Sequence, residues 1–350
     1  YQVVLKEISL DAAEKGKAAG EKVLSKLIKK GRTTEAKAKD VLGRILPTDN
    51  AKDMSDCDLI VEAVPEDRGI KEKVYKEVQE YTGDKCLFAS NTSTLPITGL
   101  SEFVQDPSRF IGLHFFSPVD RMPLVEVIRG DQSSEEAIAH GLDFVYALRK
   151  TPVVVNDGRA FFTTQVFQNY LDEGMRCLQQ GIAPALIENA ARKAGMPVGP
   201  LAVADEVSLQ LVYAIVAQTE KDTGQKMETA SAVVGRLFAK DLKRLGRKSG
   251  GGFYEYPEGG EKYLWPELAR HFPVAKDQPT SEIVGRRLLH AQALEAAKTF
   301  LEGVVTDARD GDVASILGVG FPPFTGGVFS YLDEIGLKMF VEECEQFGLV

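Results

Sequence analysis

DLIVEAV at residues 58–64, CLFA at 86–89, FIGL at 110–113 and LVEVI at 124–128 are short, nearly continuous apolar runs. Runs of this length are typical of strands that are buried on both faces of a parallel sheet. Segments with a helical spacing of apolar residues lie between these runs, as at residues 70–81. This alternation predicts an α/β fold with a doubly wound, mainly parallel sheet that helices cover on both faces.

The second half of the chain has a different pattern, because helical periodicity dominates it after the sequence NDG at 156–158. YLDEG at 170–174 followed by GMPVGP at 195–200 resembles ALEAA at 293–297 followed by GFPPFTGG at 320–327. Both copies predict a long helix, a shorter helix, a turn of Gly, an apolar residue and Pro, and a further helix. We therefore expect a duplicated all-α domain after the sheet.

The predicted domain limits follow from these two patterns. Residues 1–156 form a Rossmann-type domain, residues 157–270 the first helical domain and residues 280–350 the second helical repeat. A glycine cluster at residues 250–252 and a loop rich in aromatic residues separate the two helical parts.

The composition of the 350 residues excludes several classes of protein. A hydrophobic content of 44% and a charged content of 27% are ordinary for a soluble globular protein. The formal net charge of -9 argues against a general nucleic-acid binder. No apolar run approaches the roughly 20 residues of a membrane span, and no signal-peptide pattern is visible, so we expect a cytoplasmic protein. The four cysteines lack metal-ligand spacing, which predicts free thiols and no metal site.

A hydroxyl, an imidazole and a carboxylate each lie in, or just beyond, one of the predicted strands. They belong to Ser93, His114 and Glu126, and His114 is one of only four histidines in the chain. Ligands of a doubly wound sheet gather at the carboxyl ends of its strands. Free imidazole titrates near ~6.5, so a neighbouring carboxylate suits it to proton exchange near neutral pH. This combination indicates removal of a proton from an alcohol while a hydride leaves the same carbon.

An acid at the end of the first strand indicates the cofactor. Glu7 lies where a nicotinamide-dinucleotide site places a carboxylate on the adenosine ribose, and its charge favours NAD over NADP. The GxGxxG loop that should precede Glu7 by about 20 residues is not in the sequence, which begins at Tyr1. We expect that the first βα unit lies upstream of Tyr1.

Several ordered motifs resemble the L-3-hydroxyacyl-CoA dehydrogenase family. They are VEAVPE at residues 61–66, ASNTST at 89–94, HFFSP at 114–118 and LVEV at 124–127. GFPPF at 320–324 further resembles the multifunctional members that act in fatty-acid β-oxidation. The resemblance covers essentially the whole chain. It implies NAD-dependent oxidation of (S)-3-hydroxyacyl-CoA to 3-oxoacyl-CoA.

The resemblance also implies roles for single residues. His114 matches the general base that takes the proton of the C3 hydroxyl, and Glu126 matches the acid that orients the imidazole. Ser93 matches the serine that binds the substrate hydroxyl near the nicotinamide. The positions that match the cofactor site are Glu7, Val64, Glu66, Lys71, Ser93 and Ser117.

Two motifs depart from the family pattern. Ser117 stands where many members have an Asn that helps to hold the cofactor. The stretch AFFTTQ at 160–165 stands where the family commonly has Gly-Phe, an apolar residue, Val-Asn-Arg. Thr164 falls on the Asn position, whose side chain contacts the substrate thioester, and we expect its hydroxyl to serve there.

Three hypotheses describe the function of the whole chain. The leading one is the dehydrogenase portion of a multifunctional enzyme with an acyl-CoA substrate, an N-terminal enoyl-CoA hydratase domain and a thiolase subunit as partner. A stand-alone 3-hydroxybutyryl-CoA dehydrogenase is the enzymatic alternative. A non-catalytic scaffold portion of a β-oxidation complex is the alternative from a different class, because the glycine loop and the Asn at position 164 are missing.

Overall fold

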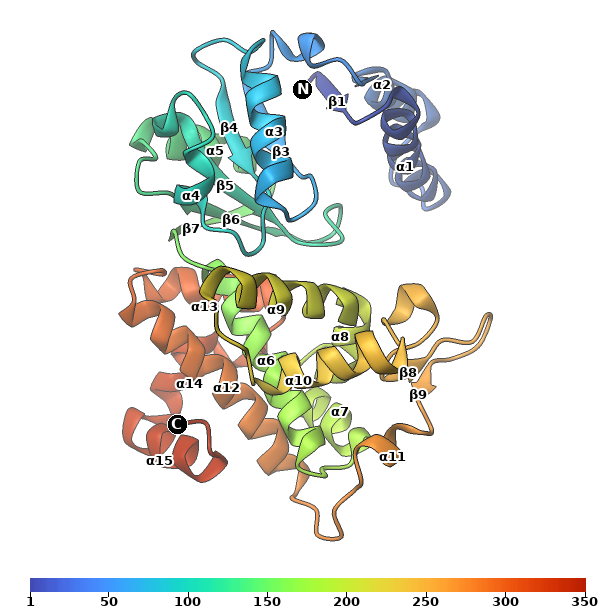
Figure 1. The fold of residues 1–350 in the computed structure, drawn as a ribbon, viewed down its shortest axis with the longest axis vertical. Coiled ribbons are helices and arrows are strands. Elements are labelled where there is room, and N and C mark those ends of the chain that lie inside the picture. The colour runs from blue at the N-terminus through green and yellow to red at the C-terminus, as the bar shows by residue number, and fades with distance from the viewer. The chain divides into compact units, whose positions relative to one another are not determined.

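The computed structural model describes residues 1–350, apart from the side chains at positions 222 and 223, and the chain divides into two compact units. Unit 1 comprises Tyr1–Leu113 and Arg129–Asp143, and unit 2 comprises His114–Ile128 and Phe144–Val350. Short strands alternate with helices in the blue and cyan part of the chain, and helices dominate the part from yellow to red (Figure 1). The Rossmann-like sheet followed by helices confirms the predicted fold class.

Five strands form the main sheet, in the order β3-β4-β5-β6-β7. Their bounds are β3 (Leu59–Glu62), β4 (Leu87–Ser90), β5 (Phe110–Phe115), β6 (Leu124–Arg129) and β7 (Thr151–Asn156). β3, β4 and β5 run parallel, with Leu59 opposite Leu87 and Phe88 opposite Phe110. Their carboxyl ends therefore meet at one edge, as predicted from the apolar runs.

A second, two-stranded parallel sheet joins β1 (Val3–Lys6) to β2 (Ile45–Thr48). The sequence predicted β1 but not β2, because β2 is short and contains Pro47, which is rare inside strands. The connection between the two strands contains α1 (Leu10–Lys29) and α2 (Glu35–Gly43). Ser9 and Thr34 cap the two helices by accepting hydrogen bonds from backbone N–H groups.

Helix α3 (Arg68–Gln79) covers one face of the main sheet. Asp67 caps it, and Lys71, Tyr75 and Val78 are buried because they recur at helical spacing on one side. The ring of Tyr75 lies edge-on to Phe88 of β4 and Phe110 of β5. The helices predicted near residues 70–81 and 134–148 are confirmed as α3 and α5 (Glu135–Ala147), and a further short helix is α4 (Ile97–Ser101).

The same helical arrangement occurs twice in unit 2. The first copy consists of α6 (Phe161–Gln179), α7 (Pro184–Lys193) and α8 (Pro200–Val207), and the second of α12 (Ser281–Leu301), α13 (Ala308–Val319) and α14 (Val328–Ile335). In each copy a carboxylate of the shorter helix accepts hydrogen bonds from the N–H groups that begin the third helix. Glu188 binds the start of α8, and Asp312 binds the start of α14. The repeated sequence order therefore corresponds to a repeated capping arrangement.

The two long helices α6 and α12 pack against each other. Arg287 of α12 forms an ion pair with Glu173 of α6 and donates a hydrogen bond to Gln180 at 2.7 Å. The other helices and strands of this unit are α9 (Leu209–Thr223), α10 (Ala230–Arg236), a π-helical turn (Leu237–Leu242), β8 (Tyr254–Glu255), β9 (Tyr263–Leu264), α11 (Leu268–His271) and α15 (Leu337–Phe347).

The glycine cluster at residues 250–252 encloses the buried carboxylate of Asp205. Asp205 accepts hydrogen bonds from the N–H groups of Phe253 and Tyr254, at 2.8 and 2.9 Å. A Cβ at Gly252 would lie 1.9 Å from Asp205 Oδ1, so only glycine fits there. Burial raises the pKa of Asp205 to about 6 against the effect of these hydrogen bonds.

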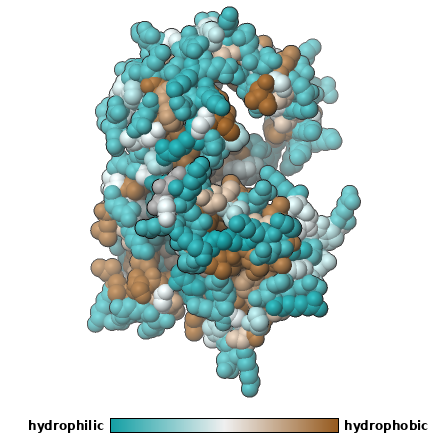
Figure 2. Space-filling model, in the orientation of Figure 1, coloured by the Kyte–Doolittle hydropathy of each residue, from teal (hydrophilic) through white to brown (hydrophobic). Residues whose placement is uncertain are grey.

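The face shown in Figure 2 is mostly hydrophilic, with hydrophobic patches over the helical part of the chain. Among the described residues, no single helix has the length and apolar character to cross a membrane. One pair, Pro200–Val207 with Leu209–Lys221, meets that test only when it is counted together across a bend of 79°.

Candidate active site

His114 and Glu126 form a buried pair in unit 2. Nδ1 of His114, near the end of β5, lies 2.7 Å from Oε2 of Glu126 in β6. His114 is 5% exposed and Glu126 is fully buried. Because an ionised carboxylate can only accept, Nδ1 carries the hydrogen and Nε2 keeps its lone pair. This tautomer gives His114 the proton-accepting nitrogen that the predicted base requires.

Thr163, in the first turn of α6, holds the carboxylate of Glu126. Its backbone N–H donates to Oε1 at 2.9 Å, and its hydroxyl donates to Oε2 at 2.5 Å. The residue before the helix, Ala160, has no side-chain cap, so Glu126 takes the place of one. A negative charge at a helix N-terminus is favoured because the N–H groups there are unpaired and point toward it.

Aromatic rings and one close helix surround the pair. The imidazole centroid lies 4.6 Å from that of Phe116 and 6.1 Å from that of Phe161. Gly318 of α13 approaches so closely that an added Cβ would lie 2.7 Å from Leu124 and 3.2 Å from the methyl group of Thr163. The second helical repeat therefore packs directly against the residues that support the pair.

In unit 1, Glu66 organises the loop that contains Ser93. Its Oε1 accepts hydrogen bonds from the N–H groups of Ser93 at 3.1 Å and Thr94 at 3.2 Å. The hydroxyls of Thr92 and Thr94 donate to the same oxygen. Burial opposes ionisation of Glu66, but the charge of Lys71 and these hydrogen bonds outweigh it and lower the pKa of this carboxyl. In the described hydrogen bonds of this network, Ser93 takes part through its backbone N–H.

Lys71 links Glu66 to a second carboxylate, that of Glu62. The Lys71 ammonium lies 2.8 Å from Oε1 of Glu62 and 3.3 Å from Oε2 of Glu66, and the residue is only 1% exposed. Glu62 also accepts from the hydroxyls of Tyr75 at 2.6 Å and Ser90 at 2.7 Å. Burial, followed by the charge of Glu62, raises the pKa of Tyr75, which stays a hydrogen-bond donor.

The residues expected at the cofactor fall into two groups. Val64, Glu66, Lys71 and Ser93 are brought together: the N–H of Val64 donates to Glu62 at 2.7 Å, which joins it to the network. Glu7 is exposed immediately after β1, where its carboxylate can accept hydrogen bonds from ribose hydroxyls. These residues fit NAD, because a carboxylate suits the ribose and the strand-end loops suit a ligand.

Two further predicted residues lie in unit 2. Ser117 is exposed in the loop after β5, and Thr164 is half-buried in the first turn of α6. Their roles toward cofactor and substrate stay predictions. Thr163, which supports Glu126, was missed from the sequence. Its polar side chain at the family's Val position was the available signal.

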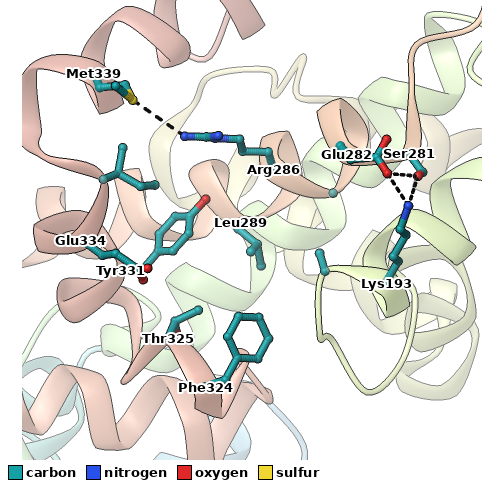
Figure 3. A pocket seen from close by; sticks show the side chains of 13 residues that line it. Lys193, Ser281, Glu282, Arg286, Leu289, Phe324, Thr325, Tyr331, Glu334 and Met339 are labelled. Carbon is teal, nitrogen blue, oxygen red and sulfur yellow. Dashed lines mark hydrogen bonds and ion pairs between the residues drawn. The ribbon is translucent and has the colours of Figure 1, made fainter.

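A pocket of about 590 Å³ lies elsewhere in unit 2, between the two helical copies (Figure 3). Leu289, Phe324 and Met339 give it an apolar lining, and Lys193 and Glu282 form an ion pair at its edge. None of the predicted site residues lines it.

Two stretches of this chain are similar in sequence to domains of a known protein family. Residues 1–158 match the NAD binding domain of 3-hydroxyacyl-CoA dehydrogenase, and residues 161–256 match the C-terminal domain of the same enzyme. The chain therefore belongs to the 3-hydroxyacyl-CoA dehydrogenase family, whose cofactor is NAD.

Three individual proteins illustrate the similarity. The fatty acid oxidation complex subunit alpha of Shewanella loihica is 36% identical over 99% of the chain, which covers 49% of that protein. The dehydrogenase part of multifunctional enzyme 1 from C. elegans is 27% identical, with a TM-score of 0.62 over 93% of this chain and 76% of that one. A 3-hydroxybutyryl-CoA dehydrogenase from Escherichia coli shares the fold, with a TM-score of 0.82 over 99% of this chain and 89% of that one, at 22% identity. The chain spans about half the length of the curated relatives it matches.

Proposed function

We propose that this chain carries out the NAD-dependent oxidation of (S)-3-hydroxyacyl-CoA to 3-oxoacyl-CoA, as part of a multifunctional enzyme of fatty-acid β-oxidation. The observation that carries the proposal is the buried pair of His114 and Glu126, in which Nε2 of the imidazole is the proton acceptor. Family membership supports the substrate class, since both matched domains belong to 3-hydroxyacyl-CoA dehydrogenase.

In the proposed reaction, NAD supplies the acceptor for the hydride that leaves C3 of the substrate. The proton of the C3 hydroxyl passes to Nε2 of His114, and the C3–O bond becomes a carbonyl. The imidazole is then positively charged, and the carboxylate of Glu126, 2.7 Å away, stabilises that charge. A positioned acid–base group of this kind contributes about 10²–10⁴ in rate.

Ser93 is proposed to donate a hydrogen bond to the reacting oxygen. Its backbone N–H is held by Glu66, which fixes the loop that carries the hydroxyl. In the same proposal Thr164 binds the thioester, Ser117 and the residues of the β1 and β3 loops contact NAD, and Lys71 acts through Glu66.

The partners and the location of the complete protein belong to the proposal as well. An N-terminal enoyl-CoA hydratase domain and a thiolase subunit are supported by the name of the S. loihica relative, a subunit of a fatty acid oxidation complex, and by its greater length. A cytoplasmic location completes this assignment.

The test is reduction of NAD by the complete protein with 3-hydroxyacyl-CoA of several chain lengths. We expect His114→Ala to lower kcat by two or more orders of magnitude, because the proton acceptor is removed. His140→Ala, which changes an exposed histidine on α5, is the matched control and should keep full activity. An active His114→Ala protein would contradict the mechanism, and an inactive wild-type protein would favour the scaffold.

A further inference from the structure

Two side chains share one oxygen of the buried carboxylate. Nδ1 of His114 and the hydroxyl of Thr163 both donate to Oε2 of Glu126, at 2.7 and 2.5 Å. The backbone N–H of Thr163 occupies the other oxygen, Oε1, at 2.9 Å. Glu126 is fully buried, so these three donors take the place of water around its charge.

The hydroxyl is a feature of this chain rather than of the motif. The corresponding segment of the L-3-hydroxyacyl-CoA dehydrogenase family commonly has Val where Thr163 stands. Valine has nearly the same shape but no hydroxyl, so it can offer Glu126 only the backbone N–H. The methyl group of Thr163 still fills the space beside Gly318, as a valine methyl would.

A hydrogen bond to an ionised carboxylate stabilises that charge and reduces its attraction for a nearby proton. The imidazole and the carboxylate are in direct contact, so a change at the carboxylate acts on the imidazole. An extra donor on Oε2 therefore makes the doubly charged imidazolium–carboxylate state less favourable relative to neutral imidazole with carboxylate. Protonation of either Glu126 or His114 weakens the hydrogen bond from the Thr163 hydroxyl. This hydrogen bond therefore lowers the proton affinity at both sites.

We propose that the hydroxyl of Thr163 is a positioning group that lowers the proton affinity of the His114–Glu126 pair and keeps the imidazole in the form that accepts the substrate proton. This inference rests on the proposed function, because it concerns the proton affinity of the same base, His114. Thr163 acts through Glu126 and does not touch the reacting atoms.

Apart from Thr163, the groups described around the His114–Glu126 pair in unit 2 are mainly apolar. Phe116 and Phe161 face the imidazole with apolar rings. α13 faces Thr163 with Gly318. Of the charged side chains of that helix, Asp312 binds the start of α14, Arg309 pairs with Asp307, and Asp310 lies in the first turn, at the opposite end of the helix from Gly318. Among the described hydrogen bonds of Glu126, the titratable partner is His114.

The test compares the pH dependence of kcat/KM for wild type, Thr163→Val and Thr163→Ser in the complete protein. Thr163→Val should move the acidic midpoint to higher pH by about 0.5–1 unit, because the proton affinity of the pair rises. Thr163→Ser keeps the hydroxyl and should keep the wild-type midpoint. Thr163→Ala also lacks the hydroxyl and carries the same prediction if valine does not fold.

A direct titration separates this inference from the proposed function. NMR of the imidazole nitrogens of His114 follows the same proton without substrate, so it reports on Thr163 even if 3-hydroxyacyl-CoA is not oxidised. A higher titration midpoint in the valine or alanine variant, with serine unchanged, supports the inference. Equal midpoints in wild type and in the variants without the hydroxyl would overturn it.

Discussion

Glu62 and Glu126 are both buried carboxylates in strands of the sheet, but their partners differ in kind. Glu62 accepts from the ammonium of Lys71 and from the hydroxyls of Tyr75 and Ser90. Glu126 accepts from Thr163 and from the imidazole of His114. The partner of Glu62 is an ammonium group, whereas the partner of Glu126 is an imidazole, the side-chain type that serves most often as an acid or base in proton transfer.

The difference shows how one residue type serves two purposes. A buried carboxylate with a fixed cation and several donors has one favourable arrangement, which suits it to holding a loop in place. A buried carboxylate beside an imidazole favours the charged form of that imidazole without imposing it, which suits proton transfer. Burial is common to both sites, and the chemistry of the partner decides between them.

Removing the fixed cation should have the largest effect on stability. Lys71→Met leaves Glu62 buried without its counter-charge, which we expect to lower the free energy of unfolding by about 3–5 kcal/mol. Urea denaturation measures this loss. Lys73→Met removes an exposed lysine from the same helix and should change little. Comparable stability of the two variants would mean that Lys71 is not the main support of this network.

The pH dependence of stability should sharpen the comparison at Glu66. Its folded pKa is lowered, so its ionised form stabilises the protein above the ordinary value of 4.5, and this stabilisation is lost as the pH falls through the folded pKa. We expect a steeper loss below about pH 4.5 in wild type than in Glu66→Gln. Glu80→Gln, at the exposed end of α3, should keep the wild-type slope. Equal slopes for wild type and Glu66→Gln would contradict the assignment.

The smallest effect concerns the backbone before α6. Ala160 has a φ of 67°, a left-handed conformation that a Cβ disfavours, and Glu126 caps the helix that begins there. Ala160→Gly should raise the free energy of unfolding by about 0.5–1 kcal/mol, since relief of strain exceeds the entropy cost of glycine. Ala139→Gly, in the exposed face of α5, should lower it by about 1 kcal/mol. Thermal or urea unfolding of both variants decides whether the sign reverses as expected.

Much of the fold was predictable because buried parallel strands are almost wholly apolar. The runs at 58–64, 86–89 and 110–113 became β3, β4 and β5 close to the expected limits. β2 was not predicted, because a four-residue strand that contains a proline lacks the continuous apolar run of a buried strand. The duplicated helical order was also visible, although the matching roles of Glu188 and Asp312 became clear only from their contacts.

The sequence by itself determined the strand–helix order and the motifs of the family, because these depend on local patterns. The resemblance that those motifs carry implied the pairing of His114 with Glu126. Tertiary structure alone decided that Thr163 holds Glu126, 37 residues away along the chain, and that Gly318 packs behind it. It also decided that Lys71 lies between two carboxylates. Such contacts depend on how a helix end docks onto a strand, and hydrogen bonds across that distance leave no periodic trace in a sequence.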